Sequence, residues 1–327
     1  MRRSAPPREI VKHTMSENRE IKCCVCHVPL APPYRTLGGR AYCERHYAMV
    51  NKPHPGFWRA TVIQIISMAL LAVVVALLAQ RVIGPLSGAP LLLAGVLLAI
   101  VPSALWLAFF YQQDRLEPEP KHQVAAVFLL AALLTDVFLR RVVNDWFRPA
   151  EWASRDTLTS LLASILIIAA TSQLIIYVAI RLLVYDSEEF DERMDGIIYG
   201  TVAGLGVATL TNLYFVMANE GVALGPGVVQ TVTTALAQAS FGGLQGWFMA
   251  EAKFEHKPVW WVPAGFAAIT LFNGLFSWLI GEVSAAGLQV DPWRSLIFGV
   301  MVALFAFLLL AFLMRRNTEV TLRRAPR

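Results

Sequence analysis

The feature that most constrains this sequence is a series of apolar runs, each about as long as a membrane is thick. Runs of roughly 20 apolar residues have the length that an α-helix needs to cross a hydrocarbon core of about 30 Å. Only 16% of the 327 residues are charged and 56% are hydrophobic, whereas a soluble domain carries about 25% charged residues. The composition therefore excludes an ordinary cytosolic enzyme and predicts a multi-pass membrane protein.

The apolar runs predict an all-α polytopic bundle of about eight transmembrane helices, preceded by a small domain that holds all four cysteines. We divide the chain into the N-terminal domain 1–58, the membrane domain 59–314 and a basic tail 315–327. The first run begins near Ala60 without a small-residue cleavage site, so we expect no signal peptide. The predicted spans are 60–80, 86–111, 123–139, 157–185, 196–218, 227–250, 258–281 and 295–314.

Eight spans place both termini on one side of the membrane. With this topology, 22 Lys and Arg residues lie on the side of the termini and six on the other. Because cytoplasmic segments carry such an excess, we expect both termini in the cytoplasm, in a bacterial inner (plasma) membrane. The segment 140–156 does not follow this pattern, because it places four arginines on the side that has few Lys and Arg residues. The tail is expected to contact anionic lipid or to act only as a stop signal, and no nucleic acid partner is expected.

Three of the cysteines and one histidine form a metal-ligand pattern. Cys23-x2-Cys26 and Cys43-x2-His46 are two pairs separated by sixteen residues. Thiolate and imidazole ligands suit tetrahedral Zn²⁺, and bound metal would stabilise a domain that has few apolar residues. We therefore predict a small zinc-finger domain with a closed, structural zinc site and no open position for a substrate.

The same segment resembles the second zinc module of a LIM domain. The resemblance covers about 25 residues and rests on Cys-Cys-Val-Cys at 23–26, Gly-Gly-Arg-Ala-Tyr-Cys at 38–43 and Glu-Arg-His-Tyr at 44–47. It implies a structural zinc and a surface that contacts a cytoplasmic protein. Only one of the two modules of a LIM domain is present.

Polar residues inside membrane spans are energetically expensive and commonly functional. One polar cluster, residues 109–121, follows span two and contains two Glu-Pro pairs. A second, residues 190–200, leads into span five, where Asp195 is placed to cap the helix and interact with its dipole. The third is a set of uncharged residues within the spans: Thr171, Ser172, Gln173, Thr209, Thr211, Asn212, Thr233, Thr234, Gln238, Ser240 and Gln245.

These clusters resemble the PrsW family of intramembrane proteases, over roughly residues 100–250. FFYQQDRLEPEP at 109–120 is similar to the interfacial motif of that family, and FDERMDGIIYGTVAGLG at 190–206 to the segment that opens its central helix. The resemblance implies a glutamate pair and a lysine before the second motif, a Glu-Asn pair after it, and a histidine in the following span.

The positions that match these catalytic residues hold neutral side chains in this sequence. Thr171-Ser172-Gln173 stands where the glutamate pair is expected, Thr211-Asn212 replaces Glu-Asn, and Gln238 replaces the histidine. Neutral amides and hydroxyls are weak ligands for a divalent metal in lipid. None of the six histidines lies well inside a predicted span: His13, His27, His46, His54, His122 and His256.

We therefore predict a catalytically degenerate, non-enzymatic member of this family. The bundle would bind or sequester a membrane protein or peptide segment, and the zinc finger would recruit a cytoplasmic partner. The polar residues within the spans then either line the vacated protease cavity or only hydrogen-bond neighbouring helices. The family-motif positions are Asp114, Glu117, Glu119, Asp195, Asn212 and Gln238.

Two other functions stay open. One is an active intramembrane metalloprotease in regulated proteolysis that uses relocated carboxylates at Asp114, Glu117, Asp136 and Asp195. The other, a weaker interpretation, is a transporter or channel, because prolines interrupt the second span. The pairs Gly200–Gly204 and Gly242–Gly246 predict close helix packing within or between chains, so the oligomeric state is open.

Overall fold

A computed structural model describes residues 21–37, 39–51, 57–78, 88–113, 116–218, 224–255, 257–285 and 292–323. The chain divides into two compact units, Met1–Pro53 with Leu322–Arg327 and His54–Thr321, and each is described by itself. The domain boundaries drawn from the sequence at 58 and 314 stay predictions. The family-motif residue Asp114 lies outside the described residues.

The first unit contains the predicted zinc-finger segment. Gly39 has a φ of +82°, a left-handed conformation that glycine adopts without steric cost, and the strands reverse direction there. The sheet is antiparallel, with Leu37 opposite Arg40. The elements in chain order are β1 (Arg35–Leu37), β2 (Arg40–Tyr42) and α1 (Glu44–Val50).

Few apolar side chains are buried in this first unit. Among its described residues they are Cys23, Tyr42 and Val50. A core of this size supplies little stability, so small domains of this kind usually need a disulfide or a metal. No disulfide joins the four cysteines, so this unit is of the kind that a bound metal would stabilise.

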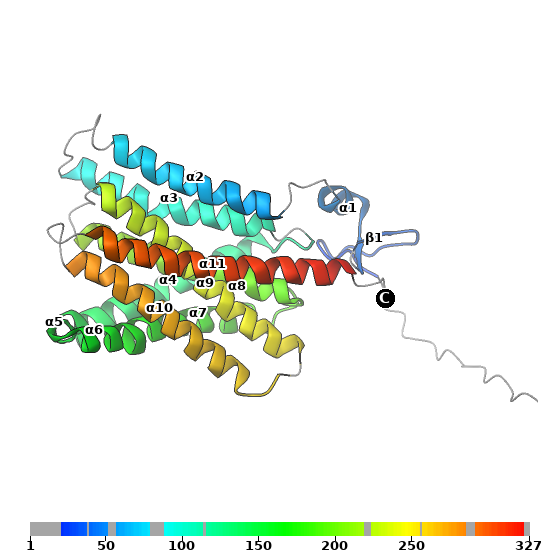
Figure 1. The fold of residues 1–327 in the computed structure, drawn as a ribbon. Helices are drawn as coiled ribbons and strands as arrows, with labels where there is room; N and C mark the ends of the chain where they lie inside the picture. The colour runs from blue at the N-terminus through cyan, green and yellow to red at the C-terminus, as the bar shows by residue number, and fades with distance from the viewer. Residues whose placement is uncertain are drawn as a thin grey trace, which may run out of the picture. The chain divides into compact units, whose positions relative to one another are not determined.

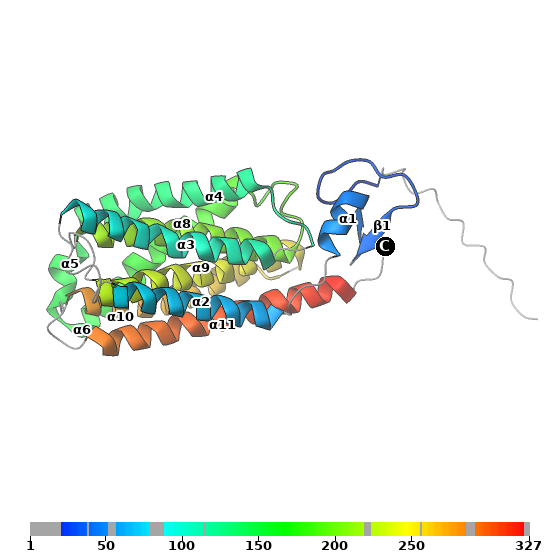
Figure 2. The same ribbon diagram turned by 90° about the horizontal axis from the view of Figure 1, so that it is seen from above.

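The second unit is a bundle of long helices that run side by side (Figures 1 and 2). Two of its segments, η2 and η4, are π-helical, and η3 is a short 3₁₀ turn. In chain order the elements are α2 (Phe57–Leu78), α3 (Ala89–Gln113), α4 (Lys121–Leu134), η2 (Thr135–Phe147), α5 (Pro149–Trp152), η3 (Ala153–Arg155), α6 (Thr157–Ala163), η4 (Ser164–Ala169), α7 (Ala170–Leu183), α8 (Arg193–Ala218), α9 (Leu224–Phe254), α10 (Trp261–Ala285) and α11 (Pro292–Arg323).

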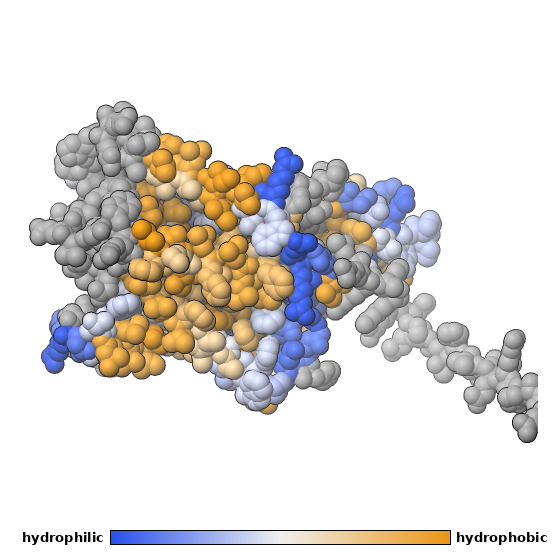
Figure 3. Space-filling model, in the orientation of Figure 1, coloured by the Kyte–Doolittle hydropathy of each residue, from blue (hydrophilic) through white to orange (hydrophobic). Residues whose placement is uncertain are grey.

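The all-α membrane bundle predicted from the sequence is confirmed. Apolar side chains cover the face that presents α10 and α11 (Figure 3), as a surface in contact with lipid requires. Six helical stretches are long and apolar enough to cross a membrane: Phe57–Val74, Leu92–Gln113, Thr157–Leu183, Arg193–Ala218, Trp261–Gly281 and Ile297–Val320.

The predicted count of eight crossings is not confirmed. The other two predicted spans, 123–139 and 227–250, fall on α4–η2 and on α9. Neither is among the stretches of the described chain that are long and apolar enough to cross. Span three carries Asp136 and is followed directly by arginines, and α9 is rich in Thr, Gln, Ser and Gly, which lowers the apolar character of both.

The third predicted span ends at 139, but the helix continues to Phe147. Asp136 contributes to the extension, because its carboxylate accepts from Arg140 Nε at 2.9 Å and from Arg141 Nε at 3.3 Å. Pairs spaced four residues apart lie on one helix face and stabilise the helix. Most of the segment expected as a loop at 140–156 is therefore helical.

Helix α8 is the centre of the bundle. It contacts α3, α4, α7 and α9, and every residue from Met194 to Thr209 is buried. A helix buried on all sides must be apolar all round, and within this stretch Asp195 is the one charged residue. The small residues of α8 allow its neighbours to approach closely.

The close approach of α8 and α9 depends on facing glycines. A Cβ atom built on Gly246 would overlap the carbonyl oxygen of Gly196, and one built on Gly200 would overlap that of Gly242. Backbone therefore packs directly on backbone, as small-xxx-small pairs permit in membranes. The close packing predicted from Gly200–Gly204 and Gly242–Gly246 is confirmed.

Replacement of Gly246 by alanine should destabilise the bundle. The methyl group has no space beside the Gly196 carbonyl, and overpacking of this kind costs about 1–3 kcal/mol. Thermal unfolding of Gly246→Ala in detergent, followed by circular dichroism, should show a clearly lowered midpoint. Gly281→Ala is the matched control, because no heavy atom of the described residues lies within 4 Å of that Cβ position. Equal midpoints for the two variants would contradict this packing.

Candidate functional site

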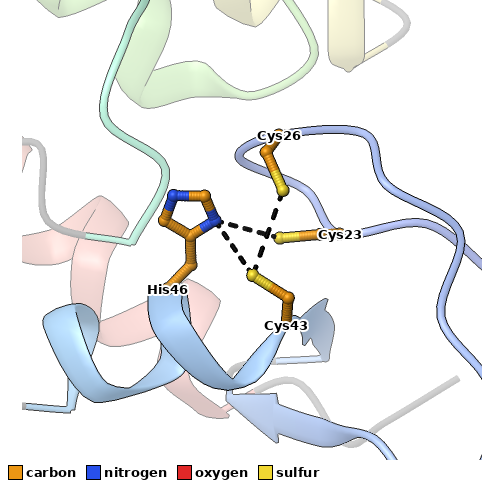
Figure 4. A group of neighbouring side chains, drawn as sticks. All are labelled: Cys23, Cys26, Cys43 and His46. Atoms are coloured by element: carbon orange, nitrogen blue, oxygen red, sulfur yellow. Dashed lines mark hydrogen bonds between the residues drawn. The ribbon is translucent and has the colours of Figure 1, made fainter.

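The four predicted zinc ligands meet at one point of the first unit. One ligand atom from each of Cys23, Cys26, Cys43 and His46 lies within 4.8 Å of the others. His46 Nδ1 is 3.2 Å from Cys43 Sγ and 3.5 Å from Cys23 Sγ, and Cys26 Sγ is 3.9 Å from Cys43 Sγ (Figure 4). Zn–S bonds of about 2.3 Å in a tetrahedron give S···S edges of about 3.8 Å. The ligand set therefore fits a tetrahedral metal.

Local backbone structure positions these four side chains. His27 N–H donates to Cys23 O at 2.8 Å, closing a tight turn around the first pair of ligands. His27 has a φ of +54°, a conformation that costs energy in any residue with a side chain. Cys43 directly precedes α1 and His46 lies in its first turn. The left-handed residue after Cys26 was not anticipated from the sequence, where a glycine would have signalled it.

The electrostatics of the cluster favour a bound cation. Burial raises the pKa of the Cys23 thiol, but the backbone amides of Cys43, Cys26 and Val25 and the His46 ring lower it further, to a net value of about 6. Burial also raises the pKa of the Cys26 thiol, and the adjacent sulfurs of Cys23 and Cys43 raise it further. Thiolates crowded together repel one another, and a metal ion removes that repulsion.

In the membrane unit, Thr171, Ser172 and Gln173 stand where the glutamate pair is expected, and each has different surroundings. Ser172 Oγ donates to Ile168 O at 2.9 Å within its own helix. Gln173 is fully buried, and neither atom of its amide has a hydrogen-bond partner among the described residues. Thr171 lines a cavity at the lipid-facing side of α7. None of these side chains is ionisable.

The other two motif positions are neutral and already paired. Asn212 Nδ2 donates to Thr231 O at 3.0 Å, joining α8 to α9. Gln238 Nε2 donates to Asn273 Oδ1 at 3.0 Å, and Asn273 Nδ2 donates back to Gln238 Oε1 at 3.4 Å. The sequence reasoning missed Asn273, although a buried amide within the seventh predicted span was a signal that could have found it.

These positions do not fit an intramembrane metal. A divalent ion in a dry site needs anionic or imidazole ligands, and the residues here are amides and hydroxyls. Their hydrogen-bonding capacity is directed at neighbouring helices, as the Gln238–Asn273 pair shows. Within the described part of the chain, the Cys23–Cys26–Cys43–His46 cluster is the one group of at least three potential ligands.

The two interfacial motifs meet at one end of α8. Asp195 accepts from the backbone N–H groups of Asp191 at 2.8 Å and Glu192 at 2.6 Å, which is the capping role expected from the sequence. Tyr199 donates its hydroxyl to Glu119 Oε2 at 2.6 Å, and the Glu119 carboxyl also interacts with Asp195. Burial raises the pKa of Glu119 to about 7, and Tyr199 and Asp195 oppose that shift.

Lys253 holds the loop between α7 and α8 against α9. Its ammonium donates to Tyr185 O at 2.5 Å and to Phe190 O at 2.7 Å, and it lies 4.8 Å from the centroid of the Phe190 ring. Phe190 stacks on Tyr199 and on Phe254. This charged and aromatic contact fixes the segment that leads into α8.

The four carboxylates of the relocated-acid hypothesis are not brought together by the described structure. Asp136 accepts from the hydroxyl of Tyr214, which is 19 residues along α8 from Asp195, or about 28 Å at 1.5 Å per residue. Asp195 and Asp136 thus lie toward opposite ends of α8. Glu117 and Glu119 lie just before α4, near the Asp195 end.

The fold and the sequence motifs define a multi-pass membrane protein of the intramembrane-protease type. A family model described as PrsW family intramembrane metalloprotease matches residues 119–312. Because this match covers more than half of the chain, the protein belongs to that family. The resemblance to the PrsW family seen in the sequence is therefore confirmed.

Curated relatives named Protease PrsW are also similar to this chain. The protein of Geobacillus kaustophilus is 29% identical over 188 residues, which are 55% of this chain and 77% of the relative. That of Bacillus subtilis is 26% identical over 191 residues, 57% and 82% of the two chains. That of Oceanobacillus iheyensis is 23% identical over 212 residues, 63% and 91%. No solved structure matches significantly.

The burial of Glu119 should make stability depend on pH. Its pKa is raised from 4.5 to about 7 in the folded protein, so the protonated acid is favoured and this contribution is fully present below pH 4.5. It is lost as the pH rises to about 7, by on the order of 3 kcal/mol. Glu119→Gln should therefore gain stability over the wild type across that pH window.

Urea unfolding of the two proteins at pH 5, 6, 7 and 8 would measure the difference. Glu188→Gln, at an exposed position, is the control and should show no such trend. A constant difference between Glu119→Gln and the wild type at all four pH values would contradict the assignment.

The Gln238–Asn273 pair should behave as a coupled unit. Either leucine variant alone leaves a buried amide without its partner, which costs about 1–3 kcal/mol. The double variant Gln238→Leu/Asn273→Leu removes both amides and should recover most of that loss. Unfolding free energies of the four proteins form a double-mutant cycle. Gln245→Leu is the control and should not destabilise, because its amide has no partner among the described residues. Additive losses would exclude the pair.

Proposed function

We propose that this PrsW-family membrane protein binds a transmembrane segment of another protein without cleaving it. The observation that carries this proposal is the neutral chemistry of the site. Gln238 stands at the histidine position and exchanges hydrogen bonds with Asn273, and Asn212 is bonded to α9. Buried amides and hydroxyls stabilise contacts between membrane helices, but they neither bind a catalytic metal nor activate water.

The N-terminal unit is proposed to bind structural zinc and to recruit a cytoplasmic protein. The sulfur and nitrogen positions match a tetrahedral site, and the small core of this unit leaves the fold dependent on the metal. The LIM-like sequence pattern supports a protein-contact surface. In the same proposal the protein lies in a bacterial inner membrane with both termini on the cytoplasmic side, where the basic tail contacts anionic lipid.

An active protease is the second candidate. The relatives are named Protease PrsW, which favours retained proteolysis. In this chain it would require relocated carboxylates at Asp114, Glu117, Asp136 and Asp195. Asp195 already accepts two backbone N–H groups, and Asp136 lies about 28 Å along α8. These contacts support the non-cleaving function over this alternative.

Zinc content separates the two functions. Purified full-length protein should hold about one zinc per chain, measured by inductively coupled plasma mass spectrometry. Cys43→Ala should lose it and unfold the N-terminal unit while the bundle keeps its helical signal. Cys24→Ala is the matched control and should retain the zinc, because Cys24 is outside the ligand cluster. Zinc that persists when all four ligands, Cys23, Cys26, Cys43 and His46, are replaced together would place metal in the bundle and favour the protease.

A further inference from the structure

A groove runs along the lipid-facing side of the membrane unit between η2 and α7. It has a volume of about 340 Å³. Its walls include Phe138 and Phe147 on one side and Leu166 and Leu174 on the other. These four side chains are between 45% and 67% exposed, so large apolar side chains project along both edges of the groove. Such rows of side chains are what a packing helix interdigitates with.

Both walls of the groove contain π-helix. The η2 segment covers Thr135–Phe147 and the η4 segment Ser164–Ala169, and they contact one another. π-Helical segments are rare and occur frequently at functional sites. Two of them at one groove single out this face among the described surfaces of the bundle.

Thr171 is the one polar residue that lines the groove. Its hydroxyl makes no hydrogen bond within the described structure, whereas the neighbouring Ser172 hydroxyl bonds to its own helix. Thr171 is 14 residues from Thr157 and 12 from Leu183, hence about 20 Å from either end of that span. An unpaired hydroxyl therefore lies near the midpoint of the candidate span Thr157–Leu183, at the first of the three residues that replace the expected glutamate pair.

We infer that this groove docks a single transmembrane helix of a partner protein, one with Ser, Thr or Asn near its midpoint. This inference rests on the proposed function and names the place and the chemistry of binding. The partner's polar side chain would pair with the Thr171 hydroxyl at the same depth, and its apolar residues would fill the walls. A lipid acyl chain packs equally well against the apolar walls, but it has no polar group to hydrogen-bond with the Thr171 hydroxyl.

A second groove supplies a comparison on the same molecule. It has a volume of about 250 Å³, lies between α9, α10 and α11, and includes Leu244, Phe272 and Leu309 in its lining. The surface that its lining side chains present to the groove is apolar throughout. Apolar helices and lipid chains should therefore not distinguish the two grooves, but a helix with a central polar residue should prefer the one with Thr171.

Photocrosslinking of the full chain in lipid nanodiscs tests the inference. A photoreactive amino acid replaces Leu174 in one protein and Leu309 in another. The probes are two synthetic polyleucine transmembrane peptides with lysine ends, one with a central Asn and one without. We expect the Asn peptide to crosslink at 174, about threefold or more above the all-Leu peptide, with no such preference at 309.

Variants then identify the groups responsible. Thr171→Val should reduce crosslinking of the Asn peptide to the all-Leu level, and Thr318→Val, whose hydroxyl bonds to Met314 O on α11, should not. Leu166→Trp should block the groove. Leu182→Trp is its matched control, because Leu182 is 70% exposed and is outside the groove lining. Circular dichroism of each variant verifies that the bundle is folded.

The outcomes separate failure of this inference from failure of the proposed function. Equal crosslinking of both peptides at 174, crosslinking at 309 in place of 174, adducts with lipid alone, or no peptide crosslinking at either position would each overturn the inference. Recovery of cleaved probe peptide, seen as new termini by mass spectrometry, would instead overturn the non-cleaving function on which it rests.

Discussion

The contact between α8 and α9 is the one on which the rest of the membrane unit depends. Lipid supplies no hydrophobic force to hold helices together, so close packing must do so. Facing glycines let the two backbones touch at Gly196–Gly246 and Gly200–Gly242. With α9 held at this distance, α8 is enclosed by α3, α4 and α7. The depth of each polar side chain on α8 and α9 is then fixed relative to its neighbours.

The contact between α8 and α9 also determines how the amide at Gln238, one of the family-motif positions, is paired. Gly204 packs on the backbone of Gln238, which sets the depth at which the Gln238 amide meets Asn273. A histidine and carboxylates at these positions would need a metal or a proton to be tolerated in a dry core. Amides satisfy one another instead. At Asn212 and Gln238 the described structure therefore holds amides that are hydrogen-bonded to neighbouring helices.

Hydrogen bonds of charged side chains, in addition to close glycine packing, stabilise the end of α8 that carries the interfacial motifs. Two charged side chains there are paired with backbone groups: the buried Asp195 accepts from two N–H groups, and the exposed Lys253 donates to two carbonyls. Glu119 is also buried, lies beside Asp195 and accepts from the Tyr199 hydroxyl. These contacts join the segments before α4, before α8 and at the end of α9 into one structure.

The sequence by itself determined the membrane class, the helical bundle, the family and the four-ligand cluster. Each depends on local composition or on ligand spacing within a short segment, as Cys23-x2-Cys26 and Cys43-x2-His46 do. Only the tertiary structure decided that Gln238 pairs with Asn273, that Glu119 meets Tyr199 and that Asp136 and Asp195 are far apart. These are contacts between helices distant in sequence, and the order of residues along the chain does not fix the rotation of one helix against another.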